Sequence, residues 1–275
     1  MKEKSFEVKL NLQIEEQVQL LPAENAFCKI SYKKKNLNFF IFSRYTDNTI
    51  KLYNDKKDYI KSLKWNCFIS SIVTKSNSEF ESNIIIGDYN GYLTELNLKY
   101  KESQTVSALE VNRVQAHDCM IKEILYSERL GVVISVDAKN VITINNAYSF
   151  CVITIIEPQN SYGDIKKILL SKNDFLYIQY ESVLEQYTLN GILVDEQIRK
   201  SSIAGVELYE EVNHLFIEVD RKIEKYLTYN LTKKKMLQQQ DLSKKGEDLV
   251  KFVFSNELKM ALIVYKDNTL EIKDY

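Results

Sequence analysis

One pattern recurs six times along this chain: an apolar run, a short polar turn, and a strand in which apolar and polar residues alternate. This pattern predicts a β-hairpin. The hairpins are expected near residues 38–54, 83–97, 131–146, 174–188, 214–227 and 259–274. The alternating strands end at aligned positions about 44 residues apart on average, a spacing typical of repeat proteins. The aligned positions are Tyr53, Leu96, Asn145, Tyr187, Tyr226 and Lys273.

Each unit holds two further strand candidates outside its hairpin. FCVITII (150–156) is an alternating stretch that follows one hairpin, and MIKEILYS (120–127) is an apolar stretch that precedes another. Four strands in every 40–45 residues or so are typical of a β-propeller blade. We therefore predict an all-β fold, a β-propeller of four-stranded blades, in which residues 1–275 form a single domain. A sandwich or barrel with evenly spaced hairpins is the alternative, although six units with one strand order fit it poorly.

The composition says more about which functions to expect than about the fold. The net charge of −1 gives no sign of a general nucleic-acid binder, and no apolar run is long enough to span a bilayer. Only two histidines are present, which argues against a metal site built from several of them. The cysteines form no C-x-x-C pair, and the N-terminus lacks the apolar region of a secretory signal, so reduced and mostly buried thiols are expected.

The units resemble degenerate WD repeats. None keeps the Trp-Asp pair at the aligned position, and the Gly-His that opens a repeat survives once, loosely, as Ala116-His117. The acid of the hairpin turn is kept as Asp47 and Asp267, and more weakly as Asp137 and Asp220. The resemblance implies a buried histidine–serine–acid network in one blade, with packing holding the others.

A second resemblance covers most of the chain. FSRYTDNTIKLYN (42–54), AHDCMIKEILYSERLGVVIS (116–135) and VLEQYTLNGILVDEQI (183–198) are similar, in order, to motifs of the C-terminal propeller of BEACH-domain proteins. The tail 255–275 is similar to the last blade of that propeller. This resemblance implies a scaffold in membrane trafficking. The BEACH domain itself is expected upstream and does not occur in this sequence, so it was lost, lies on a separate chain, or belongs to a longer protein.

The number of blades depends on the N-terminal segment SFEVKLNL (5–12). One interpretation makes it the outer strand that closes the last blade, which gives six blades. The other makes it the third strand of a truncated extra blade, which gives seven. An unclosed propeller would leave unpaired strand edges, and this favours the first interpretation.

Five residues are candidates for protein contacts. Tyr45, Tyr89 and Tyr265 lie beside hairpin turns and Trp65 precedes a repeat, so these four are expected on one rim. His117, which opens a repeat, is the fifth candidate. Core packing explains each aromatic about equally well. His117-Asp118 could form a proton-transfer pair, but a structural hydrogen bond between blades is the stronger interpretation.

Other polar motifs have structural explanations. GDYNGY (87–92) joins two strands and precedes no helix, so it is not a phosphate loop. The lysine clusters at 33–35, 233–235 and 244–245 are expected in solvated loops, with contact to anionic lipid or RNA backbone as the alternative. We predict no catalytic, cofactor-binding or metal-binding residue.

The sequence thus predicts a non-enzymatic scaffold in the cytoplasm or at the cytoplasmic face of membranes. The expected partners are other proteins, including a BEACH-domain chain or a large complex, with no specific nucleic acid, no transmembrane segment and at most peripheral membrane contact. The alternative is an architectural subunit of a large stable assembly, such as a cytoskeletal or ciliary complex.

Overall fold

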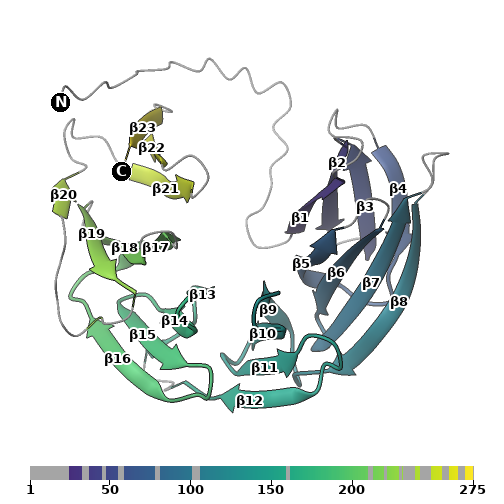
Figure 1. The fold of residues 1–275 in the computed structure, drawn as a ribbon, viewed down its shortest axis with the longest axis horizontal. Coiled ribbons are helices and arrows are strands. Elements are labelled where there is room, and N and C mark those ends of the chain that lie inside the picture. The colour runs from purple at the N-terminus through teal and green to yellow at the C-terminus, as the bar shows by residue number, and fades with distance from the viewer. Residues whose placement is uncertain are drawn as a thin grey trace. The chain divides into compact units, whose positions relative to one another are not determined.

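The structure is a computed structural model, and its regular elements are β-strands (Figure 1). It describes residues 25–32, 37–44, 48–54, 59–77, 81–100, 106–158, 162–209, 213–219, 222–228, 231, 239–241, 249–255, 260–265 and 270–274. The strands divide between two compact units, β1–β12 within Val18–Gln159 and β13–β23 within Asn160–Tyr275.

Three four-stranded antiparallel sheets make up the first unit. The first sheet contains β1 (Asn25–Tyr32), β2 (Leu37–Arg44), β3 (Thr49–Asn54) and β4 (Tyr59–Lys64). The second contains β5 (Ile69–Asn77), β6 (Glu81–Asp88), β7 (Tyr92–Tyr100) and β8 (Val106–Gln115). The third contains β9 (Ile121–Ser127), β10 (Val132–Asp137), β11 (Ile142–Asn146) and β12 (Val152–Ile156). Strand β5 contacts both β1 and β9, so the first strands of these three sheets lie next to one another. We call the first strand of each four-stranded sheet its inner strand and the fourth its outer strand.

The second unit follows the same plan in its described part. One sheet contains β13 (Lys167–Leu170), β14 (Phe175–Gln179), β15 (Val183–Thr188) and β16 (Leu193–Ile198). The next contains β17 (Ile203–Tyr209), β18 (His214–Val219), β19 (Lys222–Leu227) and β20 (Gln239–Asp241). A three-stranded sheet contains β21 (Leu249–Ser255), β22 (Met260–Tyr265) and β23 (Leu270–Asp274).

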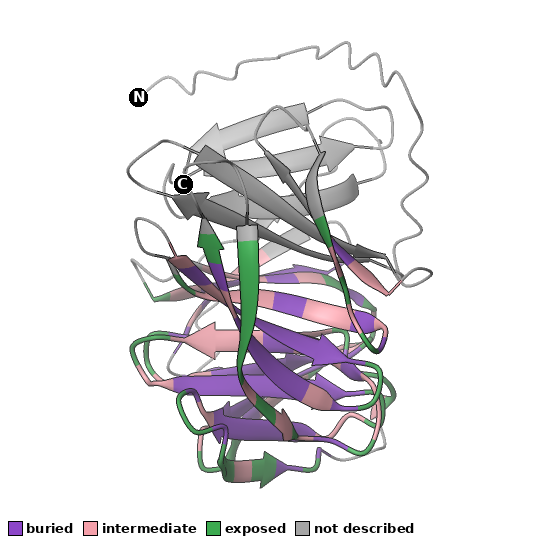
Figure 2. Ribbon diagram, turned by 90° about the vertical axis from the view of Figure 1, so that its right-hand side faces the viewer, coloured by how far each residue is buried: buried purple, intermediate pink, exposed green. Residues whose placement is uncertain are grey.

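The middle strands of the second and third sheets are buried, because these two sheets pack against each other (Figure 2). Every residue of β10 is buried, and Ile84, Ile85 and Ile86 of β6 are fully shielded from solvent. This explains why the second strand of each unit reads as a continuous apolar run, whereas a strand with one solvated face would alternate. A core of Ile85, Ile121 and Phe150 joins the second and third sheets.

A β-bulge marks the same place in four of the sheets. In each, the outer strand carries one extra residue opposite the third strand: Ile60, Val111, Ile153 or Val194. The bulge lies directly before the partner residue Tyr53, Leu96, Asn145 or Tyr187. These are four of the positions on which the sequence units align, so the structural period matches the sequence period.

The predicted fold class, an all-β arrangement of four-stranded units with six clear repeats, is confirmed by these sheets. The segment 5–12, expected to close the last blade, lies outside the described residues. That residues 1–275 form a single domain stays a prediction. Over the described residues, no helix is long and apolar enough to cross a membrane.

Candidate protein-binding site

The turn between β6 and β7 follows from its local sequence. The Asp88 carboxylate accepts hydrogen bonds from the backbone N–H groups of Asn90, at 2.9 Å, and Tyr92, at 3.0 Å. Gly91 then adopts a φ of +83°, which glycine reaches without steric cost. Asp88 is therefore a turn acid of the kind expected at Asp47 and Asp137, although the repeat pattern alone did not mark it.

The connection between β8 and β9 is fixed onto this turn. Backbone N–H groups of Ala116 and His117 donate to the Gly91 carbonyl oxygen at 3.0 and 3.1 Å. The approach is so close that a Cβ on Gly91 would lie 2.1 Å from the His117 carbonyl oxygen. Only glycine fits here, and its presence holds two loops that are far apart in sequence against each other.

His117 is buried and lies at the centre of a polar network. Its Nε2 is 2.8 Å from the Ser135 hydroxyl and 3.0 Å from the Thr143 hydroxyl, and its Nδ1 is 3.3 Å from Asp137 Oδ2. A carboxylate only accepts hydrogen bonds, so Nδ1 carries the proton and Nε2 accepts from a hydroxyl. Burial lowers the pKa of His117, and the nearby Asp137 carboxylate opposes that shift.

This network matches the histidine–serine–acid arrangement implied for one blade, with Thr143 as an additional member. Asp137 also accepts from the backbone N–H groups of Lys139 and Val141, at 2.9 and 2.8 Å, so it fixes the β10–β11 turn. The partner of His117 is thus Asp137, and Asp118 beside it is exposed. This geometry fits the structural hydrogen bond better than the proton-transfer pair.

The three fixed loops surround a hollow of about 640 Å³. We call it the loop hollow, and its lining residues are Tyr89, Asn90, Tyr92, Gln115, Asp118, Cys119, Met120 and Ala138. These residues lie in the loops and at the strand ends of the second and third sheets, within one compact unit.

Two aromatic side chains of the loop hollow are held in place. The Tyr89 ring packs edge-on against Phe68, with centroids 6.3 Å apart, while 45% of the residue stays exposed. The Arg113 guanidinium lies 4.4 Å from the Tyr92 ring centroid and 3.7 Å from the Asp88 carboxylate. The hollow therefore presents a positioned aromatic ring, a thioether and a carboxylate to solvent.

The other candidate residues are placed differently. The Trp65 backbone N–H donates to the Asn48 carbonyl oxygen at 2.8 Å, so Trp65 occupies in the first sheet the place of Ala116 in the second. The partly buried Trp65 indole has no hydrogen-bond partner among the described residues. Tyr45 lies outside the described residues, and Tyr265 ends β22 with its side chain not described. The structure thus brings Tyr89 and His117 to one place, and the contact role of all five residues stays a prediction.

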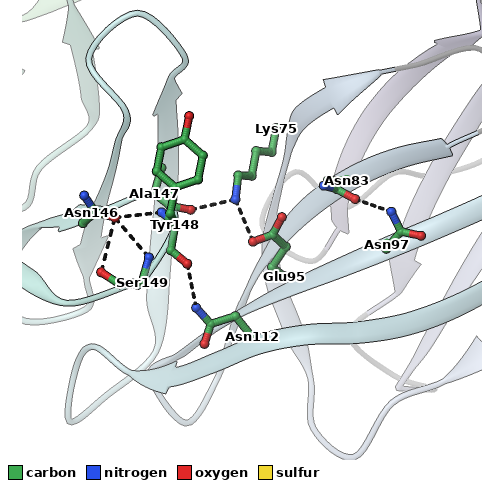
Figure 3. A network of polar contacts seen from close by, with 9 residues as sticks. All are labelled: Lys75, Asn83, Glu95, Asn97, Asn112, Asn146, Ala147, Tyr148 and Ser149. Atoms are coloured by element: carbon green, nitrogen blue, oxygen red, sulfur yellow. Dashed lines mark hydrogen bonds and ion pairs between the residues drawn. The ribbon is translucent and has the colours of Figure 1, made fainter.

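A buried polar network centred on Lys75 joins the two sheets that carry the loop hollow (Figure 3). Lys75 Nζ on β5 is 2.7 Å from Glu95 Oε2 on β7, and it also donates to the Ala147 carbonyl oxygen at 2.7 Å. The side chains of Lys75 and Glu95 are only 8% and 4% exposed. Asn112 of β8 adds a bond to the Tyr148 carbonyl oxygen at 3.2 Å. Sequence reasoning missed this network, and the glutamate in the alternating strand LTELNL was its only signal.

Within the described ranges, no group of three or more His, Cys, Asp or Glu side chains is arranged to hold a metal ion. Cys67 is buried, Cys119 is partly buried and Cys151 is exposed, so the free thiols are less buried than expected.

Comparisons with known proteins show the fold and no family. No protein-family model matches the sequence, and no curated protein matches it. A chain of the solved structure titled "Crystal Structure of Mitotic Checkpoint Complex" matches with a TM-score of 0.62 at 10% sequence identity. The match covers 90% of this chain and 73% of that chain. With the six sheets of the described residues, this likeness identifies the fold as a β-propeller.

Proposed function

We propose that this chain is a non-enzymatic scaffold that binds other proteins through the loop hollow. The observation that carries the proposal is the half-exposed Tyr89 ring, fixed at the edge of a hollow whose three loops are hydrogen-bonded in place. A solved structure of similar fold belongs to a complex of proteins, which supports the same class of function.

The aromatic surface of the loop hollow is restrained before any partner binds. Tyrosine supplies a large contact area with few rotatable bonds, and the Phe68 contact already restrains the Tyr89 ring. Met120 adds a side chain that adapts to the shape of its partner. A surface that is ordered before binding loses less entropy on association, so more of the contact energy appears as affinity.

The finer proposal is that the partner includes a BEACH-domain chain and that the setting is membrane trafficking. Its support is the motif resemblance at 42–54, 116–135 and 183–198. Cytoplasmic localisation is part of this proposal, supported by cysteines that are free in the described part of the chain.

A specific observation favours the second candidate, an architectural subunit. Outer strands β8, β12 and β16 expose large apolar side chains; these are Leu109, Val111, Val152, Ile153, Ile155, Leu193, Val194 and Ile198. Exposed apolar surface of this kind is covered when a subunit is built into a permanent assembly.

The test compares the proteins that three forms of the chain capture from its native source. Tyr89→Ala removes the proposed anchor, and Tyr148→Ala is the matched control, because Tyr148 is 72% exposed and lies outside the loop hollow. Quantitative mass spectrometry should show partners retained by the native chain and by Tyr148→Ala but depleted at least tenfold by Tyr89→Ala, about 1.4 kcal/mol.

The identity of the captured proteins separates the two candidates. A BEACH-domain chain among the depleted proteins supports the finer proposal. If a cytoskeletal or ciliary set of proteins is captured equally by the native chain and by Tyr89→Ala, the loop hollow is rejected as the binding site and the architectural subunit is favoured.

A further inference from the structure

Strand β12 is an outer strand with an unusually apolar surface. It pairs with β11 alone among the described strands, because it ends the sheet order β12-β11-β10-β9. Val152, Ile153 and Ile155 are 50%, 56% and 55% exposed. An outer strand of this kind presents backbone hydrogen-bonding groups beside an apolar surface, which favours pairing with a further strand.

The other outer strands carry charged residues that discourage such pairing. Strand β4 has Lys61 and Lys64, β8 has Glu110 and Arg113, β16 has Asp195 and Glu196, and β20 has Asp241. Strand β12, with the sequence VITII, has none. A β-bulge can also discourage pairing between outer strands. Strands β4, β8 and β16 have charged residues in addition to their bulges, whereas β12 has a bulge alone.

We propose that β12 pairs antiparallel with β12 of a second copy of this chain, centred on Thr154. In that register Thr154 faces its own copy, Ile153 faces Ile155 and Val152 faces Ile156. Every cross-strand pair then joins two β-branched residues, which is a favourable combination in sheets. A two-fold axis requires such a self-complementary surface, and VITII has the required symmetry of apolar, apolar, threonine, apolar, apolar.

The flanking charges fit the same arrangement. The only charged residue within three positions of the strand on either side is Glu157, which follows β12. Continuing the register places Glu157 opposite Cys151, so the pairing brings no like charges face to face. The strand and the three residues on either side of it contain no basic residue that would favour an acidic partner segment.

The size of the contact sets its expected strength. One five-residue strand from each copy buries less than the ~1,200 Å² at which standard stable interfaces begin. We therefore expect a reversible dimer with a dissociation constant on the order of 10–100 μM, which a high local concentration would populate. This inference is independent of the loop hollow and of its proposed partner.

The first test is analytical ultracentrifugation of the intact chain from about 1 to 500 μM, a range chosen to span the expected constant. Ile155→Lys places a charge on β12, and Ile198→Lys is the matched control, because Ile198 is 64% exposed on the charged outer strand β16. The native chain and Ile198→Lys should dimerise, and Ile155→Lys should stay monomeric with an unchanged circular dichroism spectrum.

The second test is covalent and reads the register. In a Cys151→Ser background, Thr154→Cys places the two new thiols opposite each other, so mild oxidation should give a disulfide-linked dimer. Cys151→Ser alone should stay monomeric on a non-reducing gel. A native chain that is monomeric throughout the concentration range, or a dimer that survives Ile155→Lys, overturns the proposal. So does a monomeric chain that loses a captured foreign protein with Ile155→Lys, because the strand would then pair with that partner.

Discussion

Gly91 lies at the tip of the β6–β7 turn, where the connection from β8 to β9 packs directly against its backbone. The stretch GDYNGY predicts a turn with Asn90-Gly91 at its tip, and the structure places the turn there. What local sequence does not predict is the contact with His117, because this depends on where a later connection of the chain returns. Turn chemistry is local and can be predicted, whereas close approach between loops is not local.

Replacing Gly91 with alanine should destabilise the fold strongly, because both its φ of +83° and the missing space near His117 oppose a Cβ. Gly163 is the matched control, since its φ is +79° but no atom lies within 4 Å of the place that a Cβ would take. Gly163→Ala should cost roughly 1–2 kcal/mol from the backbone alone, and Gly91→Ala about 3 kcal/mol or more. Urea unfolding measures both, and equal losses would contradict the contact.

Glu218 should make stability depend on pH. It is 8% exposed on β18, and burial raises its pKa from 4.5 to about 7. The folded state therefore binds more protons than the unfolded state between these values, so stability falls as pH rises through this window. Replacing the acid with glutamine removes the titration while keeping the shape.

The measurement is the unfolding free energy of the native chain and of Glu218→Gln at pH 4.5 and pH 8, bracketing the shift. The advantage of Glu218→Gln should grow by about 2–3 kcal/mol between the two pH values. Glu157→Gln, at an exposed position, is the control and should show no such growth. A constant difference for Glu218→Gln would mean that this carboxyl titrates normally.

At the scale of strands, the hairpins follow from alternation and apolar runs, but the neighbours across sheets do not. Lys75 and Glu95 lie on β5 and β7, which are separated by β6 within one sheet, and Ala147 belongs to the next sheet. Their local sequence does not predict that Lys75 reaches both the Glu95 carboxylate and the Ala147 carbonyl oxygen. Interactions between sheets are set by packing, and strand periodicity carries no information about them.

Removing one partner of the Lys75–Glu95 pair should lower the free energy of unfolding much more than replacing both partners. Lys75→Met leaves the Glu95 carboxylate buried without its cation, which should cost about 3–5 kcal/mol. Lys75→Met with Glu95→Met removes both charges, so it should recover most of that loss. The exposed pair Lys99–Glu81 is the control, and Lys99→Met should leave stability almost unchanged, because solvent screens this pair. A double variant no more stable than the single one would show that the charges are not coupled.

For the whole molecule, the repeat period was enough to predict the β-propeller class, because each unit repeats the same strand order. The loop hollow could not be predicted, since it is built from three loops that the fold brings together and the sequence separates. Tyr89 lies at the loop hollow and His117 is buried beneath it, and the role of both residues in protein contacts stays a prediction. The BEACH resemblance rests on motifs alone and stays a proposal.

The measurement that tests the central claim most directly is hydrogen exchange of the chain, free and bound to a captured partner, by mass spectrometry. Binding at the loop hollow predicts slowed exchange concentrated in 88–92, 115–120 and 137–140, with 193–198 of the outer strand β16 unchanged. Protection confined to the outer strands, with those three loops exchanging as in the free chain, would contradict the account.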